Sequence, residues 1–396
     1  MLTYLLISAR RLGWLGLDRP AVALSGAVAC VVFGVLTPER AAASVDGNTL
    51  LLLVGVMGMG AFLAVDGFFT DLEGGLARWA ATPERLLGFV IWGGGLLGAL
   101  VTNDAVCILA APLVVQLIVR NGLPPLPYLL GLATAANTGS AATLVGNPQN
   151  MLCAQLGGLG YLDHLLLVGP VAVAGLAINH GVLAWMYRGV LRSARLHPAP
   201  PAPVFRRQTV LTLAVIAAST IACTLGTDLA WTALTAFVLL MLLHHRDTRR
   251  LWPHIDGSLL LFFVGLFVVV EGLRAEGWPA RFFEVVPLAP DGDPTSFRLA
   301  GLFLVGSNIV SNVPFILVVE DQLATLTNPT LGWELLAMAS TFAGNLTLLG
   351  SVANIIVAES ARDLGGFGFW QHLKVGLPVA LLTTVLGVLW LGWVGG

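Results

Sequence analysis

The sequence carries little charge and few of the features of a water-soluble protein. Only 11% of its 396 residues are Asp, Glu, Lys or Arg, whereas ordinary soluble domains contain about 25%. Hydrophobic residues make up 57% of the chain, and the mean hydropathy is +0.85. The net charge of −2 gives no sign of a basic surface for nucleic acid. This composition is typical of a chain whose helices lie in a lipid bilayer.

Cysteine is scarce, and motifs of secretion or hydrolysis are missing. The four cysteines lie in apolar segments without metal-site spacing, so we expect no metal and no cofactor: Cys30, Cys107, Cys153 and Cys223. Residues 1–16 are too short and arginine-rich to span and lack a signal-peptide layout, so we expect residues 1–19 to form an interfacial helix. No His-Glu-x-x-His or Gly-x-Ser-x-Gly occurs, which argues against an intramembrane hydrolase and against any enzyme.

Long apolar runs dominate the chain. Runs of roughly 18 apolar residues suffice to cross hydrocarbon, and residues 49–65, 164–186 and 375–394 approach or exceed that length. We therefore predict an all-α polytopic membrane protein of the cell (inner) membrane. The basic loops 188–208 and 244–250 are expected to stay cytoplasmic, which places the amino terminus inside and the carboxyl terminus outside.

The two halves of the chain resemble one another. "GAFLAVDG" (60–67) matches "GLFVVVEG" (265–272), "VTNDAV" (101–106) matches "VSNVPF" (310–315), and "GNPQN" (146–150) matches "GSVAN" (350–354). With the loops assigned in this way, the two halves begin on opposite faces of the membrane. The repeat is therefore inverted, as in many secondary transporters. Asp66 and Glu271 match across the repeats at the ends of their spans, where we favour boundary or cavity-mouth roles.

We accordingly divide the chain into two inverted repeats joined by a cytoplasmic linker. The first repeat is 20–187 and the second is 209–396, with the proline-rich linker at 188–208. Each repeat is expected to hold a re-entrant hairpin with a polar tip and a transmembrane helix broken by glycine. The hairpins are predicted at 86–120 and 297–323, and the broken helices at 128–156 and 333–360.

The polar tips and helix breaks are the candidate binding site. Unwound backbone survives at membrane depth only where protein or a water-filled cavity covers it, and its carbonyls, amides and hydroxyls can bind a solute or cation. We expect these residues to contact the solute: Thr102, Asn103, Asn137, Thr138, Gly139, Ser140, Ser311, Asn312, Gly344, Asn345 and Thr347. The alternative for any single Ser or Thr is that it merely joins membrane helices.

Asp104 is the sharpest candidate for ion coupling, because the second repeat has Val313 at the matching place. A desolvated acid present on one repeat only is what a proton-coupled carrier needs. Asn103 and Asn150 are expected to assist as proton or cation ligands. The alternative is a permanently paired carboxylate that caps a helix. No Arg or Lys falls within the tips or breaks, which favours a neutral polyhydroxy solute over a carboxylate.

At these residues the chain resembles the plant silicon efflux transporters. The shared pattern lies in "GALVTNDAVCILAAPLVVQLIVRNGLPPLPYLLGLATAANTGSAATLVGNPQN" (98–150). It comprises TND, RNGLPP-x-P, LAT-x-AN-x-GS-x-AT and GNPQN, with "SNVP" consistent in the second half. The whole chain is similar to the wider ion transporter superfamily, which includes the arsenical pump membrane protein ArsB and the divalent-anion/sodium symporters.

The resemblance implies an elevator-type carrier, often a homodimer, in which a transport domain moves against a scaffold. It also implies proton-driven efflux of silicic acid, with arsenite as another substrate and sodium as the alternative coupling ion. Two other readings stay open: a sodium- or proton-coupled carrier of citrate-like or inorganic anions, and a passive channel. In every reading the partners are a small solute and the lipid bilayer.

Overall fold

The computed structural model describes residues 18–196, 206–245, 247–288 and 295–394, which form helices and turns without a strand. Most of the interfacial helix expected at 1–19 lies outside these residues. Six of the described helices are long and apolar enough to cross a membrane: Gly47–Val65 (α4), Asn103–Asn121 (α7), Tyr161–Met186 (α10), Arg207–Thr224 (α12), Gly257–Ala275 (α14) and Phe369–Val394 (α20). The fold is the all-α polytopic membrane architecture that the sequence predicts.

The same order of elements occurs twice. In the first repeat α4 is followed by α5 (Phe68–Ala80), the hairpin of α6 (Pro83–Leu100) and α7, the broken helix of α8 (Pro125–Ser140) and α9 (Pro148–Gly157), and then α10. In the second repeat α14 is followed by α15 (Trp278–Val285), the hairpin of α16 (Ser296–Val310) and α17 (Asn312–Leu323), the broken helix of α18 (Pro329–Leu346) and α19 (Val352–Ser360), and then α20.

The remaining described helices begin the two repeats, join them or lie between the helices already named. They are α2 (Arg19–Val32), α3 (Pro38–Ala43), α11 (Arg188–Ser193), α12, α13 (Leu229–His244) and four short 3-10 turns, at Thr248–Arg250, Trp252–His254, Leu348–Gly350 and Arg362–Leu364. The predicted linker 188–208 thus begins with α11, and its central part, 197–205, lies outside the described residues.

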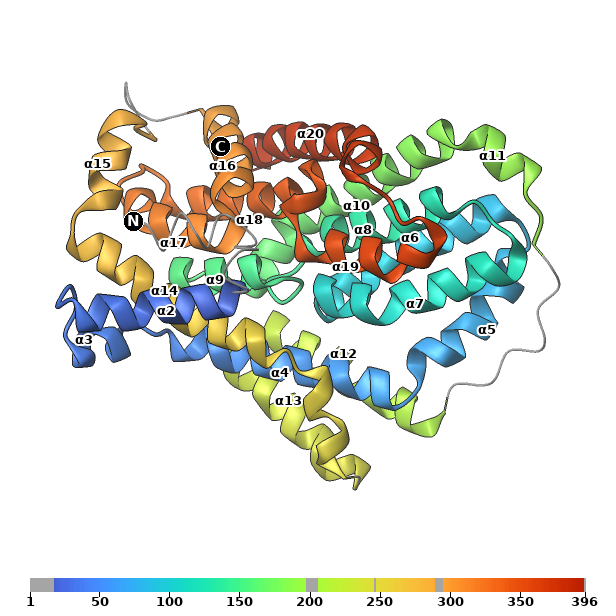
Figure 1. Ribbon diagram of the computed structural model, residues 1–396, viewed down its shortest axis with the longest axis horizontal. Helices are drawn as coiled ribbons and strands as arrows, with labels where there is room; N and C mark the ends of the chain where they lie inside the picture. Colours follow the sequence, from blue (N-terminus) through green and yellow to red (C-terminus); the bar gives the residue numbers. More distant parts are fainter. Residues whose placement is uncertain (1–17, 197–205, 246, 289–294, 395–396) are drawn as a thin grey trace.

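The two repeats interlock through equivalent contacts. Helix α2 packs along α14 as α13 packs along α4, and these four helices run along the lower side of the molecule in Figure 1. Above them, α7 contacts α19 and α9 contacts α17, so the hairpin of each repeat meets the broken helix of the other. The hairpin tips and the helix breaks are thereby brought to one region between the repeats.

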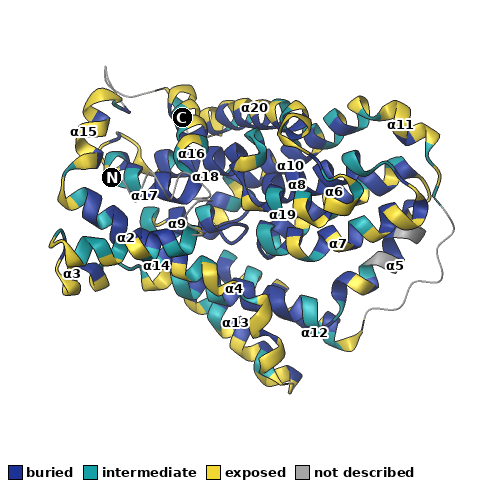
Figure 2. Cartoon of the chain, viewed as in Figure 1, coloured by how far each residue is buried: buried dark blue, intermediate teal, exposed yellow. Residues whose placement is uncertain are grey.

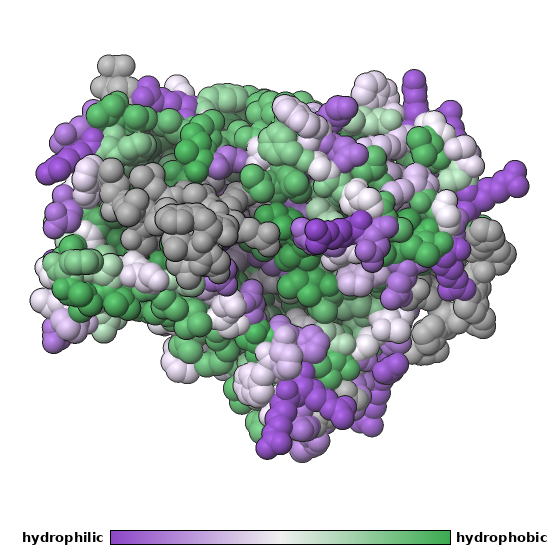
Figure 3. Space-filling view, viewed as in Figure 1, coloured by the Kyte–Doolittle hydropathy of each residue, from purple (hydrophilic) through white to green (hydrophobic). Residues whose placement is uncertain are grey.

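The first segments of the broken helices form the centre of the core. Residues 127–140 of α8 and 332–345 of α18 are buried throughout, and Figure 2 shows them dark blue inside the molecule. The face seen in Figure 3 carries many apolar side chains, and hydrophilic side chains are most frequent at its left and right edges and at the lower tip, where α13 ends. A protein core surrounded by apolar side chains suits a lipid environment.

Small residues let α8 approach α6 more closely than any side chain would allow. A Cβ atom added to Gly139 would lie 2.1 Å from the carbonyl oxygen of Gly95, and one added to Gly146 would lie 2.2 Å from the carbonyl oxygen of Ser140. These glycines therefore serve close backbone packing at the hairpin and at the break, as small residues commonly do between membrane helices.

The acids Asp66 and Glu271 attach their helices to neighbouring ones. Asp66 accepts a hydrogen bond from Thr212 Oγ1 (2.7 Å), and its Oδ2 lies 3.0 Å from His244 Nε2. Glu271 forms an ion pair of 2.7 Å with Arg40. Asp66 directly follows the last residue of α4, whereas Glu271 lies inside α14, which ends at Ala275. The predicted match of these two acids is therefore wrong, because the residue of α14 that stands where Asp66 stands in α4 is Glu276.

The substitution Gly139→Ala tests the close approach of α6 and α8. The added methyl group would force two backbones apart, and overpacking of this kind costs about 1–3 kcal/mol. We expect thermal unfolding in detergent, followed by tryptophan fluorescence, to shift to lower temperature. Gly93→Ala is the matched control, because a Cβ there meets nothing within 4 Å. An unchanged melting temperature for Gly139→Ala would contradict the packing argument.

Candidate transport site

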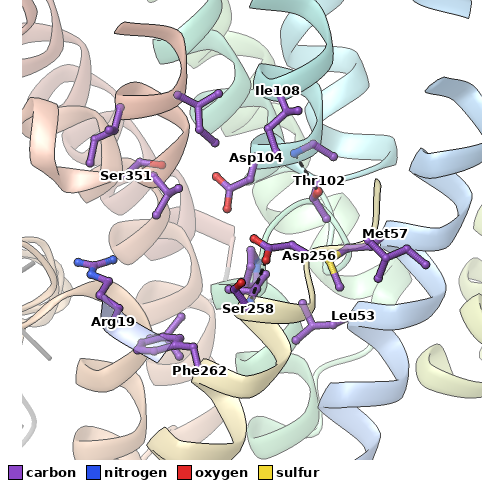
Figure 4. Close-up of a pocket in the computed structure, with 18 of the residues that line it drawn as sticks. Arg19, Leu53, Met57, Thr102, Asp104, Ile108, Asp256, Ser258, Phe262 and Ser351 are labelled. Carbon is purple, nitrogen blue, oxygen red and sulfur yellow. Dashed lines mark hydrogen bonds between the residues drawn. The ribbon is translucent and has the colours of Figure 1, made fainter. Parts of the chain in front are cut away.

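A cavity of about 640 Å³ lies where the two hairpin tips meet the flanking helices. Its lining comes from the middle of α4, the turn at Trp252–His254, the starts of α2, α9, α14 and α19, and the two hairpin tips, between α6 and α7 and between α16 and α17. The polar residues of this lining include Arg19, Thr102, Asp104, Gln149, Asp256, Ser311, Asn312 and Ser351, and Figure 4 shows most of them around the cavity.

The first hairpin tip is firmly docked. Thr102 caps α7, since its Oγ1 accepts a hydrogen bond from the backbone N–H of Ala105 at 3.3 Å. The backbone N–H of Asn103 donates to the carbonyl oxygen of Gly146 at 3.0 Å, so the tip is joined to the break between α8 and α9. This docking sets Asp104 in the first turn of α7, facing the cavity.

The second tip is built differently. Ser311 has φ +86°, a backbone region that favours glycine, and its side chain does not cap α17. Its hydroxyl instead accepts a long hydrogen bond of 3.5 Å from the Arg19 guanidinium. A residue held in so unfavourable a conformation depends on its surroundings to keep it there. The second tip thus relies on contacts with other elements, including α2.

Buried oxygen atoms at the tips lack partners among the described residues. They are Oδ1 of Asn103, Oδ1 of Asp104 and Oδ1 of Asn312. Because a buried polar atom without a hydrogen bond costs free energy, such atoms in a cavity are favourable places for a ligand that donates hydrogen bonds. Asp104 also has two charged neighbours, the like charge of Asp256 and the opposite charge of Arg19. Figure 4 shows the carboxyl groups of Asp104 and Asp256 pointing toward the same space.

Behind the cavity, Asn137 is the centre of a closed hydrogen-bond network. Its Oδ1 accepts from Asn103 Nδ2 (2.8 Å) and from Ser351 Oγ (3.0 Å). Its Nδ2 donates to Oδ1 of Asn345 and to Oδ1 of Asn354, both at 3.0 Å. This side chain, 1% exposed, therefore joins the first hairpin, both broken helices and hence both repeats.

The helix breaks are closed by equivalent amides. Asn150 Nδ2 donates to the carbonyl oxygen of Thr143 at 2.9 Å, and Asn354 Nδ2 donates to those of Gly344 (2.7 Å) and Thr347 (3.2 Å). Thr341 Oγ1 in turn donates to Asn150 Oδ1 at 2.9 Å. Carbonyl groups that a helix leaves unpaired at its end are thus satisfied within the protein.

The predicted site residues fall into two groups. Thr102, Asp104, Ser311 and Asn312 line the cavity. Asn103 is bonded through its Nδ2 while its Oδ1 lacks a partner among the described residues. The side chains of Asn137, Thr138, Ser140, Asn150 and Asn345 form hydrogen bonds inside the network or at the breaks, and Thr347 donates to Asn308 Oδ1 at 3.1 Å. Gly139 and Gly344 lie in the helix packing next to them. The residues of the network and the breaks therefore hold the cavity-lining residues in position.

Sequence reasoning missed Arg19 and Asp256, which reach the cavity from outside the tips and breaks. A signal for Asp256 exists, because "DGNTLLLLVG" (46–55) and "DGSLLLFFVG" (256–265) are a further match between the repeats. In both places the aspartate caps the helix that follows, α4 or α14. We find no comparable pattern for Arg19, whose proximity to the cavity arises only from the packing of α2 against α14.

Comparisons with known proteins agree with this architecture. The model of the citrate transporter family matches residues 4–343. The silicon efflux transporter LSI3 of Oryza sativa subsp. japonica is 32% identical, covering 95% of this chain and 92% of its own. The putative transporter arsB of Dictyostelium discoideum is 24% identical over 94% and 87%. The crystal structure of the Alcanivorax borkumensis YdaH transporter superposes with a TM-score of 0.57 at 14% identity, covering 89% and 87%, which indicates a shared fold.

Replacement of Asn137 by Ala tests the network. The substitution leaves the buried amide of Asn103 and two further buried amide oxygens without partners, and each such group costs about 1–3 kcal/mol. We expect a melting temperature in detergent well below that of the wild type and loss of transport activity. Asn48→Ala is the control, since Asn48 is an exposed residue in the first turn of α4. Equal stability of the two variants would show that the network is dispensable.

Proposed function

This chain belongs to the citrate transporter family, and from that premise we propose that it exports silicic acid by proton-coupled secondary transport. Arsenite, another small neutral hydroxide, is the second substrate that we propose. The observation that carries the proposal is the cavity itself, in which one acid of the first tip, Asp104, faces the second tip, where Val313 stands at the matching place. The similarity to a silicon efflux transporter over nearly the full chain supports the choice of solute.

The cavity suits a small solute rich in hydroxyl groups. Silicic acid is uncharged near neutral pH and offers several O–H donors together with oxygen acceptors. Oδ1 of Asp104 and Oδ1 of Asn312 are unpartnered acceptors among the described residues, and Thr102 adds a hydroxyl to the cavity lining. Hydrogen bonds from the solute would satisfy these buried oxygens, which is how a polar site distinguishes a hydroxylated ligand from a similar molecule without hydroxyls.

Asp104 would couple the solute to protons. The charged carboxylate is costly in a buried setting beside Asp256, and a proton removes that cost. Binding of a proton from one side and its release to the other would then drive the solute in the opposite direction. We propose that the hairpins and broken helices move together as a transport domain against α2, α4, α13 and α14, in a homodimer. The amino terminus would be cytoplasmic and the carboxyl terminus outside, in the cell (inner) membrane.

Arg19 favours a second candidate function, a carrier of carboxylates or inorganic anions. The tips and breaks contain no basic residue, but the packing of α2 adds a guanidinium to the cavity lining. Arginine is the side chain that most often recognises carboxylate and oxyanion groups, because its donors match their geometry. The two readings differ in what Arg19 does: in the first it contacts Ser311 and its charge acts on Asp104, and in the second it binds substrate.

Asp104→Asn tests proton coupling. The amide keeps the shape of the side chain but cannot exchange a proton, so silicic acid uptake driven by an imposed pH gradient in proteoliposomes should fall at least about tenfold. Exchange of silicic acid at equal pH on both sides should continue at a measurable rate. Unchanged driven uptake would refute the coupling role of Asp104, and a protein that never accumulates solute under any gradient would be a channel.

Arg19→Gln distinguishes the two solutes. If the solute is neutral, silicic acid exchange should change by no more than about threefold, because the guanidinium makes no charge pair with it. If the solute is an anion, transport of citrate or arsenate should be present in the wild type and be lost in the variant. The control is the wild type assayed with both solutes in the same vesicles. Citrate transport by the wild type that exceeds silicic acid transport would overturn our first choice.

A further inference from the structure

Two histidines occupy equivalent places in the two repeats. His164 is the fourth residue of α10 and His372 is the fourth residue of α20. Nε2 of His164 lies 3.0 Å from the carbonyl oxygen of Ala141, and Nε2 of His372 lies 2.9 Å from that of Asn345. Both carbonyls stand where the first segment of a broken helix ends. Because a carbonyl oxygen only accepts hydrogen bonds, each histidine carries its proton on Nε2 and donates it there.

The two histidines differ at the other ring nitrogen. Nδ1 of His164 lies 2.6 Å from Oε2 of Glu334 in α18, and the two side chains are 0% and 2% exposed. Nδ1 of His372 is buried and has no partner among the described residues. The spacing that matches Asn150 with Asn354 places Leu130 at the position equivalent to Glu334. The acid is therefore present at one break only, where it joins α10 of the first repeat to α18 of the second.

The geometry fixes the number of protons in this pair. With Nε2 occupied by one proton, an ionised Glu334 facing a bare Nδ1 would place two lone pairs 2.6 Å apart. One further proton must lie between the two atoms, either as imidazolium and carboxylate or as neutral imidazole and carboxylic acid. Both arrangements are neutral overall. Release of that proton leaves one uncompensated negative charge in the interior, which is strongly unfavourable there.

We propose that His164 and Glu334 form a proton-binding dyad, separate from Asp104, that holds the two broken helices together at the first break while it keeps its proton. Neither residue lines the cavity, so their role is to position the break and the network behind the site. Loss of the proton would turn the shortest link between α10 and α18 into a repulsion between lone pairs. This inference does not depend on the identity of the solute or on coupling through Asp104.

Few other ionisable groups surround the dyad. The buried thiol of Cys153 in α9 is an electrostatic neighbour of Glu334. Other buried groups on elements packed against α10 or α18 are Tyr128, Cys223 and His372, and Tyr161 lies on α10 itself. The charged residues on these elements are exposed or only partly buried: Glu84, Arg85, Asp163, Arg188, Arg192, Arg207, Arg298, Glu320, Asp321 and Lys374, as is His180 of α10. Among the described residues of these elements, no other buried Asp, Glu, Lys or Arg is present to exchange a charge interaction with the dyad.

Glu334→Gln removes the dyad's exchangeable proton while preserving its hydrogen bonds. The glutamine amide can donate to Nδ1 of a neutral His164, whose Nε2–H still donates to Ala141. We expect the wild-type melting temperature in detergent to fall by about 3 °C or more at alkaline pH, because removal of the shared proton would leave an uncompensated buried charge. The Glu334→Gln curve should lack that fall. His372→Gln is the matched control, because it alters the equivalent bond without an acid and should keep the wild-type pH dependence.

Parallel curves for the wild type and Glu334→Gln would overturn the proposal. If Glu334→Gln does not fold, the double variant His164→Leu with Glu334→Leu replaces the pair with apolar side chains, a change that buried ion pairs often tolerate. The double variant must then lack the alkaline fall in melting temperature, and its persistence would refute the dyad. The measurement needs no solute, so its failure leaves the transport proposal standing, and failure of silicic acid transport leaves the dyad standing.

Discussion

A helix that stops inside a membrane leaves carbonyl groups that no water can reach, and each of them must find a donor within the protein. The described part of the chain has two such ends, at the breaks after α8 and α18, and the rest of the structure depends on how their carbonyl groups are satisfied. An asparagine of the following segment, Asn150 or Asn354, donates to the carbonyls of each break. A histidine of the next long helix, His164 or His372, donates to one carbonyl more. Each repeat thus uses one asparagine and one histidine to satisfy the carbonyl groups at its helix break.

This solution also decides where a solute can bind. Most amides of the breaks are consumed by the backbone or by one another, with Asn137 linking them to the tip of the first hairpin. What remains available faces the cavity, chiefly Asp104, Asn312 and the hydroxyls beside them. The network is thus a rigid support, and the cavity lies on the side where its hydrogen bonds end. Supporting a binding group through a satisfied network is the usual way to hold it in place.

Much of this fold could be predicted from the sequence because the constraints of a bilayer are strong and local. Apolar runs, glycines in the breaks and the polar tips at Asn103 and Asn312 are visible in the order of residues. The division of labour among the asparagines could not be predicted, since it depends on which carbonyls lie within reach after folding. Arg19 escaped notice for a similar reason, because its place in the cavity comes from packing between α2 and α14. His164 and Glu334 are far apart in the sequence and carry no spacing that would connect them.

The long contact between Arg19 and Ser311 has a consequence for motion. Arg19 belongs to α2 and Ser311 belongs to a hairpin tip, so their contact would cross the boundary between the transport domain that we propose and the helices against which it moves. A contact across such a boundary must be weak enough to break in every transport cycle. The hydrogen bond between Arg19 and Ser311 is weak because its length is 3.5 Å. The contact is one of those that hold Ser311 at its positive φ, so its opening would let the tip relax. The unfavourable backbone conformation of Ser311 would then raise the free energy of the conformation described here and favour its departure to another one.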